Sequence, residues 1–216
     1  MVSQDLHTTI YHITLLRHGE SQGNFEGRHQ GQADYRLTGR GKEQIRLLLE
    51  RWVYERKLFD LVISSPLPRA IETAEIIADG LNIPLKPEPL WMARDNGVLA
   101  RLSPEEVQQT VPEPVFINPY QPVGQTGESL WQLYLRAGSA IQNILDNPPG
   151  NYLVVSHGGI LNMSMYAILG IHPQPKLYGP RFRFSNSAFA TLTYTPASHR
   201  WLVLGVNDHS HWDYTE

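Results

Sequence analysis

The sequence IYHITLLRHGESQGN, residues 10–24, sets a pattern that the rest of the chain repeats. Its first seven residues are mostly apolar or β-branched and predict a buried strand, which ends at a polar turn containing Gly19. Further strands of the same type are predicted at residues 59–64 and 152–156, and amphipathic helices follow them at 66–80 and 158–169. The repeated order of strand, polar turn and helix is typical of an α/β sheet.

The remaining segments complete this fold class. Thr38 can cap a helix that carries Ile45, Leu48, Leu49 and Trp52 on one face. Another helix is predicted at 127–145, and two closing strands at 188–195 and 200–206. We therefore expect a three-layer sandwich whose mostly parallel central sheet has helices on both faces. One domain is expected over residues 1–216, with a lid-like insertion around 81–123, where prolines are frequent and Ser103 caps one short helix.

Composition excludes several classes of function. The 216 residues carry 18 basic and 21 acidic side chains, a net charge of −3 that gives no basic field for nucleic acid. Cysteine is absent, so disulfides and thiolate sites are excluded. No apolar stretch has the length of a membrane span, and the polar first residues do not resemble a signal peptide. We expect a cytoplasmic protein without a membrane partner, and a homodimer is left open.

The polar residues that need an explanation follow the three predicted buried strands. Arg17 and His18 end the first strand, the second leads through a short turn to Arg69, and His157 follows the third. Ligands of such sheets bind at the carboxyl ends of the strands. Two arginines and two histidines at one place would repel each other unless an anion joined them. A phosphate dianion fits, because guanidinium groups bind its oxygens in bidentate geometry.

The segments LLRHGES, QGQADYRLTGRGKEQ, SSPLPRAIETA, GESLW and VVSHGG together resemble the histidine phosphatase superfamily, which has the phosphoglycerate mutase-like fold. This resemblance covers nearly the whole chain. It implies that His18 is a nucleophile that becomes phosphorylated on a ring nitrogen. It also implies that Arg17, Arg69 and His157 hold the phosphoryl oxygens, with help from Asn24. Because these side chains supply the positive charge, neither a metal nor another cofactor is expected.

The resemblance also suggests substrate-binding residues and a branch of the family. Ser21, Gln30, Gly31 and Gly158 are expected to contact the substrate. Gln30-Gly31 is similar to the pocket loop of the family's phosphatases, and Arg101 is the only nearby cation after Gly97. The implied function is a metal-independent hydrolase that cleaves the phosphate monoester of a small phosphorylated metabolite. The alternatives are a phosphoglycerate mutase and a catalytically weakened relative that binds phosphorylated ligands.

One departure from the family pattern concerns the general acid. Family members usually have a glutamate four residues before the glycine at position 97, whereas this chain has Ala93. Without an acid the leaving alkoxide is poorly assisted, which can lower the rate by about 10²–10⁴. Asp95 would face the same side as Ala93 in an extended segment, although it is also typical of an Asp-Asn-Gly turn. Other candidates are Glu128, Glu105 and Glu106. Alternatively the site has no strong acid, whether Ala93 is natural or the result of a substitution.

Overall fold

The computed structural model describes residues 9–110, 118–175 and 179–212. Its strands are β1 (Tyr11–Arg17), β2 (Leu61–Ser64), β3 (Leu85–Pro87), β4 (Asn151–Ser156), β5 (Phe189–Thr195) and β6 (Arg200–Asp208). Its α-helices are α1 (Gln22–Phe25), α2 (Gly39–Tyr54), α3 (Pro68–Leu81), α4 (Pro104–Thr110), α5 (Leu130–Leu145) and α6 (Gly158–Leu169). Short 3₁₀ helices within the described residues include η1 (Pro89–Trp91), η2 (Gly97–Leu99) and η4 (Pro196–Ser198). Part of the expected lid, residues 111–117, lies outside the described residues.

The strands form one six-stranded sheet in the order β3-β2-β4-β1-β5-β6. The four strands from β3 to β1 are parallel, and β5 and β6 add an antiparallel hairpin, so the mostly parallel α/β fold is confirmed. In register, Arg17 pairs with Ser156 and Ser64 with Val155. The carboxyl ends of β1, β2 and β4 therefore meet at one edge of the sheet. The turns that follow these three strands lie together there.

Strand β3 was not predicted from the sequence. It has three residues and is half-exposed, so it is too short to show the alternation that marks a strand. Its pairing with β2 places the first residues of the expected lid in the sheet itself.

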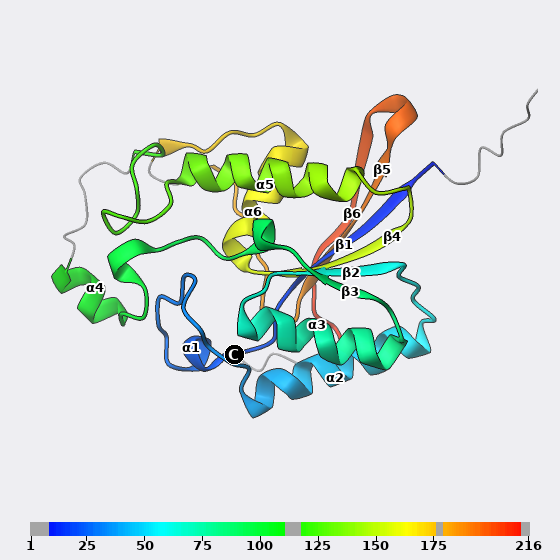
Figure 1. Cartoon of the computed structure of the whole chain (residues 1–216), viewed down its shortest axis with the longest axis horizontal. Helices are drawn as coiled ribbons and strands as arrows, with labels where there is room; N and C mark the ends of the chain where they lie inside the picture. The colour runs from blue at the N-terminus through cyan, green and yellow to red at the C-terminus, as the bar shows by residue number, and fades with distance from the viewer. Residues whose placement is uncertain (1–8, 111–117, 176–178, 213–216) are drawn as a thin grey trace, which may run out of the picture.

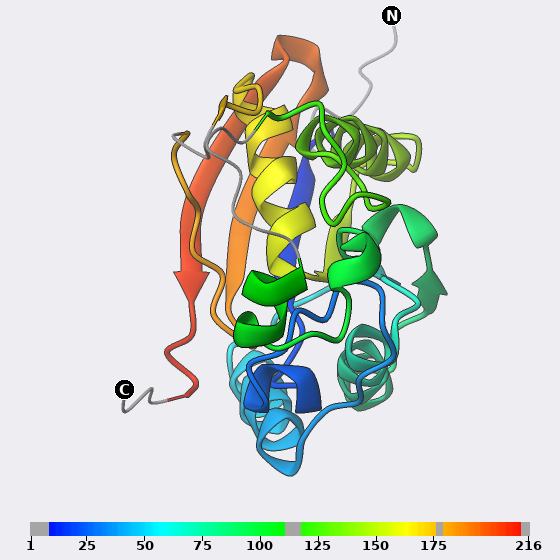
Figure 2. The same ribbon diagram turned by 90° about the vertical axis from the view of Figure 1, so that its left-hand side faces the viewer.

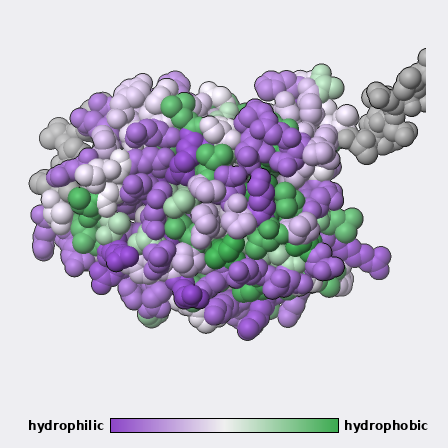
Figure 3. Space-filling model, viewed as in Figure 1, coloured by the Kyte–Doolittle hydropathy of each residue, from purple (hydrophilic) through white to green (hydrophobic). Residues whose placement is uncertain are grey.

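Helices cover both faces of the sheet, with α5 and α6 on one side and α2 and α3 on the other (Figure 1). Side chains alternate along β1, so that Ile13 and Leu15 pack with α5 and α6 while Leu16 packs with α2 and α3. Both clusters are buried, and Trp52 is enclosed in the second. Within the described residues, none of the helices combines the length and apolar character that a membrane crossing requires. The face in Figure 3 is mostly hydrophilic, with apolar groups scattered over it.

Two segments distant in sequence meet beyond the carboxyl ends of the strands. Helices α1 and α4 lie at the end of the molecule that faces the viewer in Figure 2. There the Arg28 guanidinium donates to the Arg101 carbonyl and pairs with Glu106 at 3.1 Å. The segments that follow β1 and β3 thus form the surroundings of the edge where the polar residues gather.

The turn after β1 packs directly against the start of α2. The Thr38 backbone N–H donates to the Glu20 carbonyl, and the Thr38 hydroxyl accepts from the Gly41 N–H as the helix cap. A Cβ at Gly41 would lie 2.0 Å from the Glu20 carbonyl oxygen, and one at Gly19 2.6 Å from the Gly41 oxygen. Only glycine allows two backbone segments to approach this closely, so these contacts fix the position of the turn.

We predict that Gly41→Ala destabilises the protein by about 1–3 kcal/mol, because the new methyl group meets backbone that cannot move aside cheaply. Gly39→Ala is the matched control: it lies in the same helix turn, a Cβ there meets nothing within 4 Å, and alanine favours the helix. Urea unfolding of both variants measures the difference. Equal stability of the two variants would show that the close approach of turn and helix does not constrain the fold.

Candidate active site

The structure brings the four residues from the strand ends to one cavity of about 340 Å³. Arg17, His18, Arg69 and His157 all line it. The ring centroids of His18 and His157 are 5.1 Å apart, and both rings are buried. Arg17 is the last residue of β1 and His18 follows it. Arg69 lies in the first turn of α3, and His157 connects β4 to α6. The cavity therefore collects positive or potentially positive groups from three separate parts of the sequence.

The imidazole of His18 is held in one tautomer. Its Nδ1 lies 2.7 Å from the Gly19 carbonyl oxygen, which can only accept, so Nδ1 carries the proton. The backbone N–H of His18 donates to the Ser156 carbonyl at 3.0 Å and fixes the residue against β4. Burial, followed by the charges of Arg69 and Arg17, lowers the pKa of His18 well below 6.5. At neutral pH the ring is therefore neutral, with a lone pair on Nε2.

The guanidinium of Arg69 is held by backbone oxygens. Its Nη1 donates to the Ala33 carbonyl at 2.9 Å and its Nη2 to the Gly31 carbonyl at 2.7 Å. Among the described residues Arg69 forms no salt bridge, and its buried Nε has no hydrogen-bond partner. Burial, with Arg17 as a second cause, lowers the pKa of Arg69 to about 10. A buried cation with an unused donor is suited to an anion in the cavity.

The imidazole of His157 has one nitrogen fixed and one available. Its Nε2 lies 2.8 Å from the Ser65 hydroxyl, which already accepts from the Leu67 N–H and can donate its hydrogen to Nε2. Nδ1 then carries a proton, and it has no hydrogen-bond partner among the described residues although it is buried. Burial, and next the charge of Arg69, lowers the pKa of His157 well below 6.5. An anion would give this donor its partner.

The N-terminus of α6 adds further donors to the cavity. Gly158 and Gly159, the first residues of this 12-residue helix, line the cavity. The N–H groups of a first helical turn have no partners within the helix, and this end carries partial positive charge. The helix therefore favours an anion at the same place as the arginines.

The expected substrate-binding residues divide into two groups. Gln30 and Gly31 line the cavity, whereas Ser21 and Asn24 do not. Ser21 caps α1, where its backbone N–H donates to the Asn24 Oδ1 at 3.2 Å. The Ser21 hydroxyl lies 2.7 Å from the Gln30 Oε1. Ser21 can therefore act on the cavity by positioning Gln30, and Asn24 by supporting the same turn.

The structure does not bring the candidate acid Asp95 to the cavity. Ala93 lines the cavity, but Asp95 is exposed and its Oδ1 accepts from the Gly97 N–H at 2.8 Å, as in a turn. The Glu128 carboxylate is held by two hydrogen bonds from Arg136, at 2.8 and 2.7 Å. The other two candidates lie on α4, at Glu105 and Glu106. Among the described residues no carboxylate side chain lines the cavity.

Besides Arg17 and Arg69, two further cations lie near the cavity and were missed in the sequence analysis. Arg101 does not line the cavity, but Arg94 does, and Arg181 reaches an adjoining one. Arg94 follows Ala93 directly, and this position beside the expected acid was the only feature of the sequence that could have placed Arg94 at the cavity. Arg181 comes from a distant segment, so only the fold brings it near. Arg94 precedes Gly97 and Arg181 lies outside residues 81–123, so neither belongs to the stretch after Gly97 in which Arg101 was noted.

Arg136 and Ser65 were also missed. Arg136 donates to the carbonyl oxygens of Leu90, Met92 and Ala93, at 2.8, 2.7 and 3.1 Å. It thereby fixes the segment that contains Ala93, the residue found where the family usually has its general acid. Ser65 lies in the recognised SSPLPRAIETA motif, but its contact with His157, which follows a different strand, could not be inferred from that segment alone.

Comparisons with known proteins agree with this geometry. The model of the histidine phosphatase superfamily (branch 1) matches residues 13–209. The chain is 34% identical over 212 residues to a protein of Cronobacter sakazakii named probable phosphoglycerate mutase GpmB, covering 93% of this chain and 94% of that protein. The protein of the same name from Yersinia enterocolitica is 30% identical over 212 residues, with the same coverage.

Solved structures are similar over nearly the whole chain. Bacillus stearothermophilus YhfR superposes with a TM-score of 0.80 at 28% identity, covering 92% of this chain and 98% of that one. A putative alpha-ribazole-5'-P phosphatase from Escherichia coli superposes with a TM-score of 0.79 at 25% identity, with the same coverage.

We predict that sulfate binding at about pH 6 is accompanied by proton uptake. Sulfate stays a dianion there, so any net proton uptake or release reports on groups of the protein. The pKa values of His18 and His157 are low in the empty site and rise when a dianion offsets Arg17 and Arg69. Sulfate affinity should accordingly increase as the pH falls toward the low pKa values.

Calorimetry in two buffers of different ionisation enthalpy measures this proton exchange. His157→Gln, which cannot gain a proton, should reduce the uptake. Proton release, or no exchange across the acidic range, would contradict the electrostatic description of the site.

Proposed function

Because the chain belongs to the histidine phosphatase superfamily, we propose that it hydrolyses the phosphate monoester of a small metabolite through a phosphohistidine at His18. The observation that carries this proposal is the tautomer of His18. Its Nδ1–H is engaged by the Gly19 carbonyl, so the lone pair on Nε2 remains for attack. A neutral imidazole beside two arginines is a nucleophile placed where an anionic phosphoryl group would bind.

In the first step the phosphoryl group binds among Arg17, Arg69 and His157. The Nε2 lone pair of His18 forms a bond to phosphorus while the bond from phosphorus to the ester oxygen breaks. Charge on the phosphoryl oxygens is stabilised by the guanidinium groups, by the Nδ1–H of His157 and by the N-terminus of α6. In the second step water attacks phosphorus, the nitrogen–phosphorus bond breaks, and inorganic phosphate leaves with His18 neutral again.

The leaving oxygen needs a proton from the cavity or from water. Because Ala93 occupies the usual place of the acid and no carboxylate lines the cavity among the described residues, the chain offers no strong general acid there. We infer that the reaction depends strongly on the basicity of the leaving group. Esters of acidic alcohols, such as phenols, are then better substrates than esters of simple alcohols.

A phosphoglycerate mutase is the second candidate. It is favoured by the name of the 34% identical relative, probable phosphoglycerate mutase GpmB. Hydrolysis is supported by Gln30 and Gly31 in the cavity wall, and by the named phosphatase among the similar structures. The two reactions share the phosphohistidine and differ in whether water or a sugar-acid hydroxyl takes the phosphoryl group.

We predict that a reactive aryl phosphate labels the enzyme with an acid-labile, base-stable phosphoryl group. His18→Ala should abolish this label, since it removes the attacking nitrogen. His157→Ala should slow its formation, since it removes one donor. Rapid-quench labelling measures both.

Retention of the label in His18→Ala would show that the nucleophile has been misassigned. With 3-phosphoglycerate as substrate, formation of the 2-isomer faster than free phosphate would favour the mutase. Stoichiometric labelling without turnover would instead indicate a weakened relative that binds phosphorylated ligands.

We predict that Ala93→Glu accelerates alkyl phosphates by at least tenfold and leaves aryl phosphates nearly unchanged. A carboxyl group there can protonate an alkoxide, whereas p-nitrophenoxide, whose conjugate acid has a pKa of about 7, leaves with little help. The ratio of kcat/KM for glycerol phosphate and p-nitrophenyl phosphate measures the effect. Asp95→Asn is the matched control, because its side chain lies outside the cavity. If Asp95→Asn depresses the alkyl reaction and Ala93→Glu does not raise it, the site has an acid after all.

A further inference from the structure

A second cavity of about 250 Å³ adjoins the catalytic cavity. Arg94, Gly158 and Gly159 line both cavities, so the two share a wall. The phosphoryl group of a substrate occupies only the first cavity in the proposed reaction. The second cavity is therefore placed to receive the rest of the molecule.

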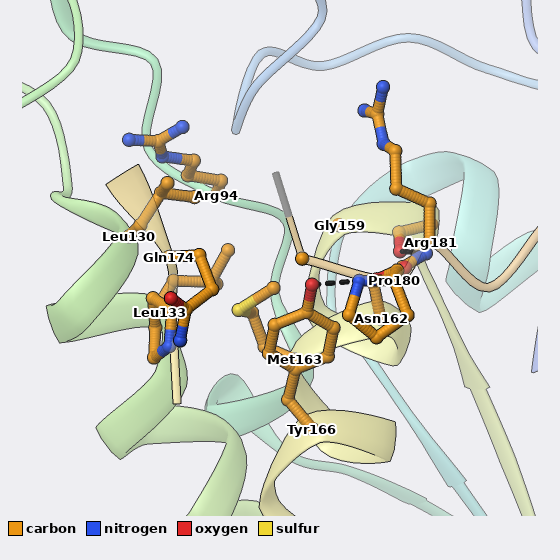
Figure 4. Close-up of a pocket in the computed structure, with 13 residues that line it drawn as sticks. Arg94, Leu130, Leu133, Gly159, Asn162, Met163, Tyr166, Gln174, Pro180 and Arg181 are labelled. Atoms are coloured by element: carbon orange, nitrogen blue, oxygen red, sulfur yellow. Dashed lines mark hydrogen bonds between the residues drawn. The ribbon is translucent and has the colours of Figure 1, made fainter. Parts of the chain in front are cut away.

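The floor of this second cavity is apolar. Leu130 and Leu133 contribute to it from α5, and Met163 and Tyr166 from α6 (Figure 4). The side chain of Leu133 is only 2% exposed, so the floor is continuous with the core. A cavity of roughly 150 Å³ is enough to hold a benzene ring. The volume here thus admits a group of at least that size, and a short polar chain would leave the floor uncovered.

Two arginines flank the apolar floor on opposite sides in Figure 4, at Arg94 and Arg181. The Nε of Arg94 donates to the Glu128 carbonyl at 2.8 Å, and its Nη groups make no hydrogen bond to a described residue. Arg181 is exposed and forms no salt bridge with the described carboxylates. The Glu128 carboxylate, whose charge acts on Arg94, is already engaged by Arg136. Both guanidinium groups are therefore available to an anionic ligand.

The position of Arg181 is defined by its neighbours. The Asn162 side chain on α6 donates to the Phe182 carbonyl and accepts from the Phe182 N–H at 2.9 Å. The Tyr166 hydroxyl donates to the Pro180 carbonyl at 2.6 Å. A Cβ at Gly179 would lie 2.2 Å from that hydroxyl, so a larger residue at this position would displace the Tyr166 side chain. Arg181 thus stands on a segment that is bound to the cavity floor from both sides.

We propose that the second cavity binds the alcohol portion of the substrate, and that this portion has an apolar body of about one ring and a carboxylate. The apolar floor receives the body, and the planar guanidinium forks of Arg94 and Arg181 match a carboxylate. This inference rests on the proposed hydrolysis at His18 and adds the substrate class. A three-carbon phosphoglycerate has a carboxylate for the arginines but no apolar body to cover the floor of the cavity.

Three phenyl phosphates with matched para substituents test the proposal. The substituents are carboxymethyl, carbamoylmethyl and aminoethyl, which are similar in size and differ in charge. All three leaving phenols are similarly acidic, so differences in kcat/KM report on binding of the substituent. We expect the carboxylate ester to exceed the neutral amide by about tenfold, the effect of one charge-assisted contact, and the amine to fall below the amide.

Variants of the arginine assign any preference to this cavity. Arg181→Glu should invert the order of the carboxylate and the amine. Arg200→Gln should keep it, since Arg200 is an exposed arginine at the start of β6 and outside both cavities. Equal rates for the three esters, or an unchanged order in Arg181→Glu, would overturn the inference while hydrolysis at a labelled His18 stands. If no ester is hydrolysed and His18 is never labelled, it is the proposed function that fails.

Discussion

Three arginines (Arg17, Arg69 and Arg94) and two histidines line one cavity at the edge of the sheet, and no carboxylate side chain of the described residues lines it. Such a cluster is tolerable only while the imidazoles stay neutral, because each protonation would add charge to a poorly hydrated space. The low pKa values of His18 and His157 follow directly from this constraint. In the proposed reaction, the same constraint favours an anion in the cavity and leaves a lone pair on His18 for attack, so the two proposed properties share one electrostatic origin.

The fold maintains this cluster by bringing three strand ends into register. Arg17 is paired with Ser156 across the β1–β4 ladder, and the N–H of the next residue, His18, continues the contact to β4. The glycines at 19 and 41 let α2 clamp the turn from the other side. Arg136 then fixes the segment that closes the cavity, through three carbonyl oxygens and the Glu128 carboxylate. Each part of the site is therefore attached to a regular element of secondary structure.

The parts that the sequence predicted are those determined within one strand and its following turn. Buried strands show a clear apolar pattern, and parallel pairing brings their ends together, so the grouping of His18, Arg69 and His157 could be inferred without coordinates. Asp95 was misleading because its neighbourhood is a turn rather than an extended segment. Arg181 and Ser65 were missed because their partners lie on other elements, and no local periodicity encodes such contacts.

The way in which Arg69 is held has a consequence for how this protein can evolve. Its guanidinium is fixed by the main-chain oxygens of Gly31 and Ala33, and the proton of His18 by that of Gly19. These acceptors do not depend on a side chain, although Gly19 and Gly31 are themselves constrained, the first by its contact with Gly41 and the second by its φ of +51°. Under the proposed function, mutations elsewhere in the cavity wall can therefore change which alcohol is accepted while the groups proposed to hold the phosphoryl group stay in place. A scaffold with this property can diversify in specificity while its chemistry is inherited intact.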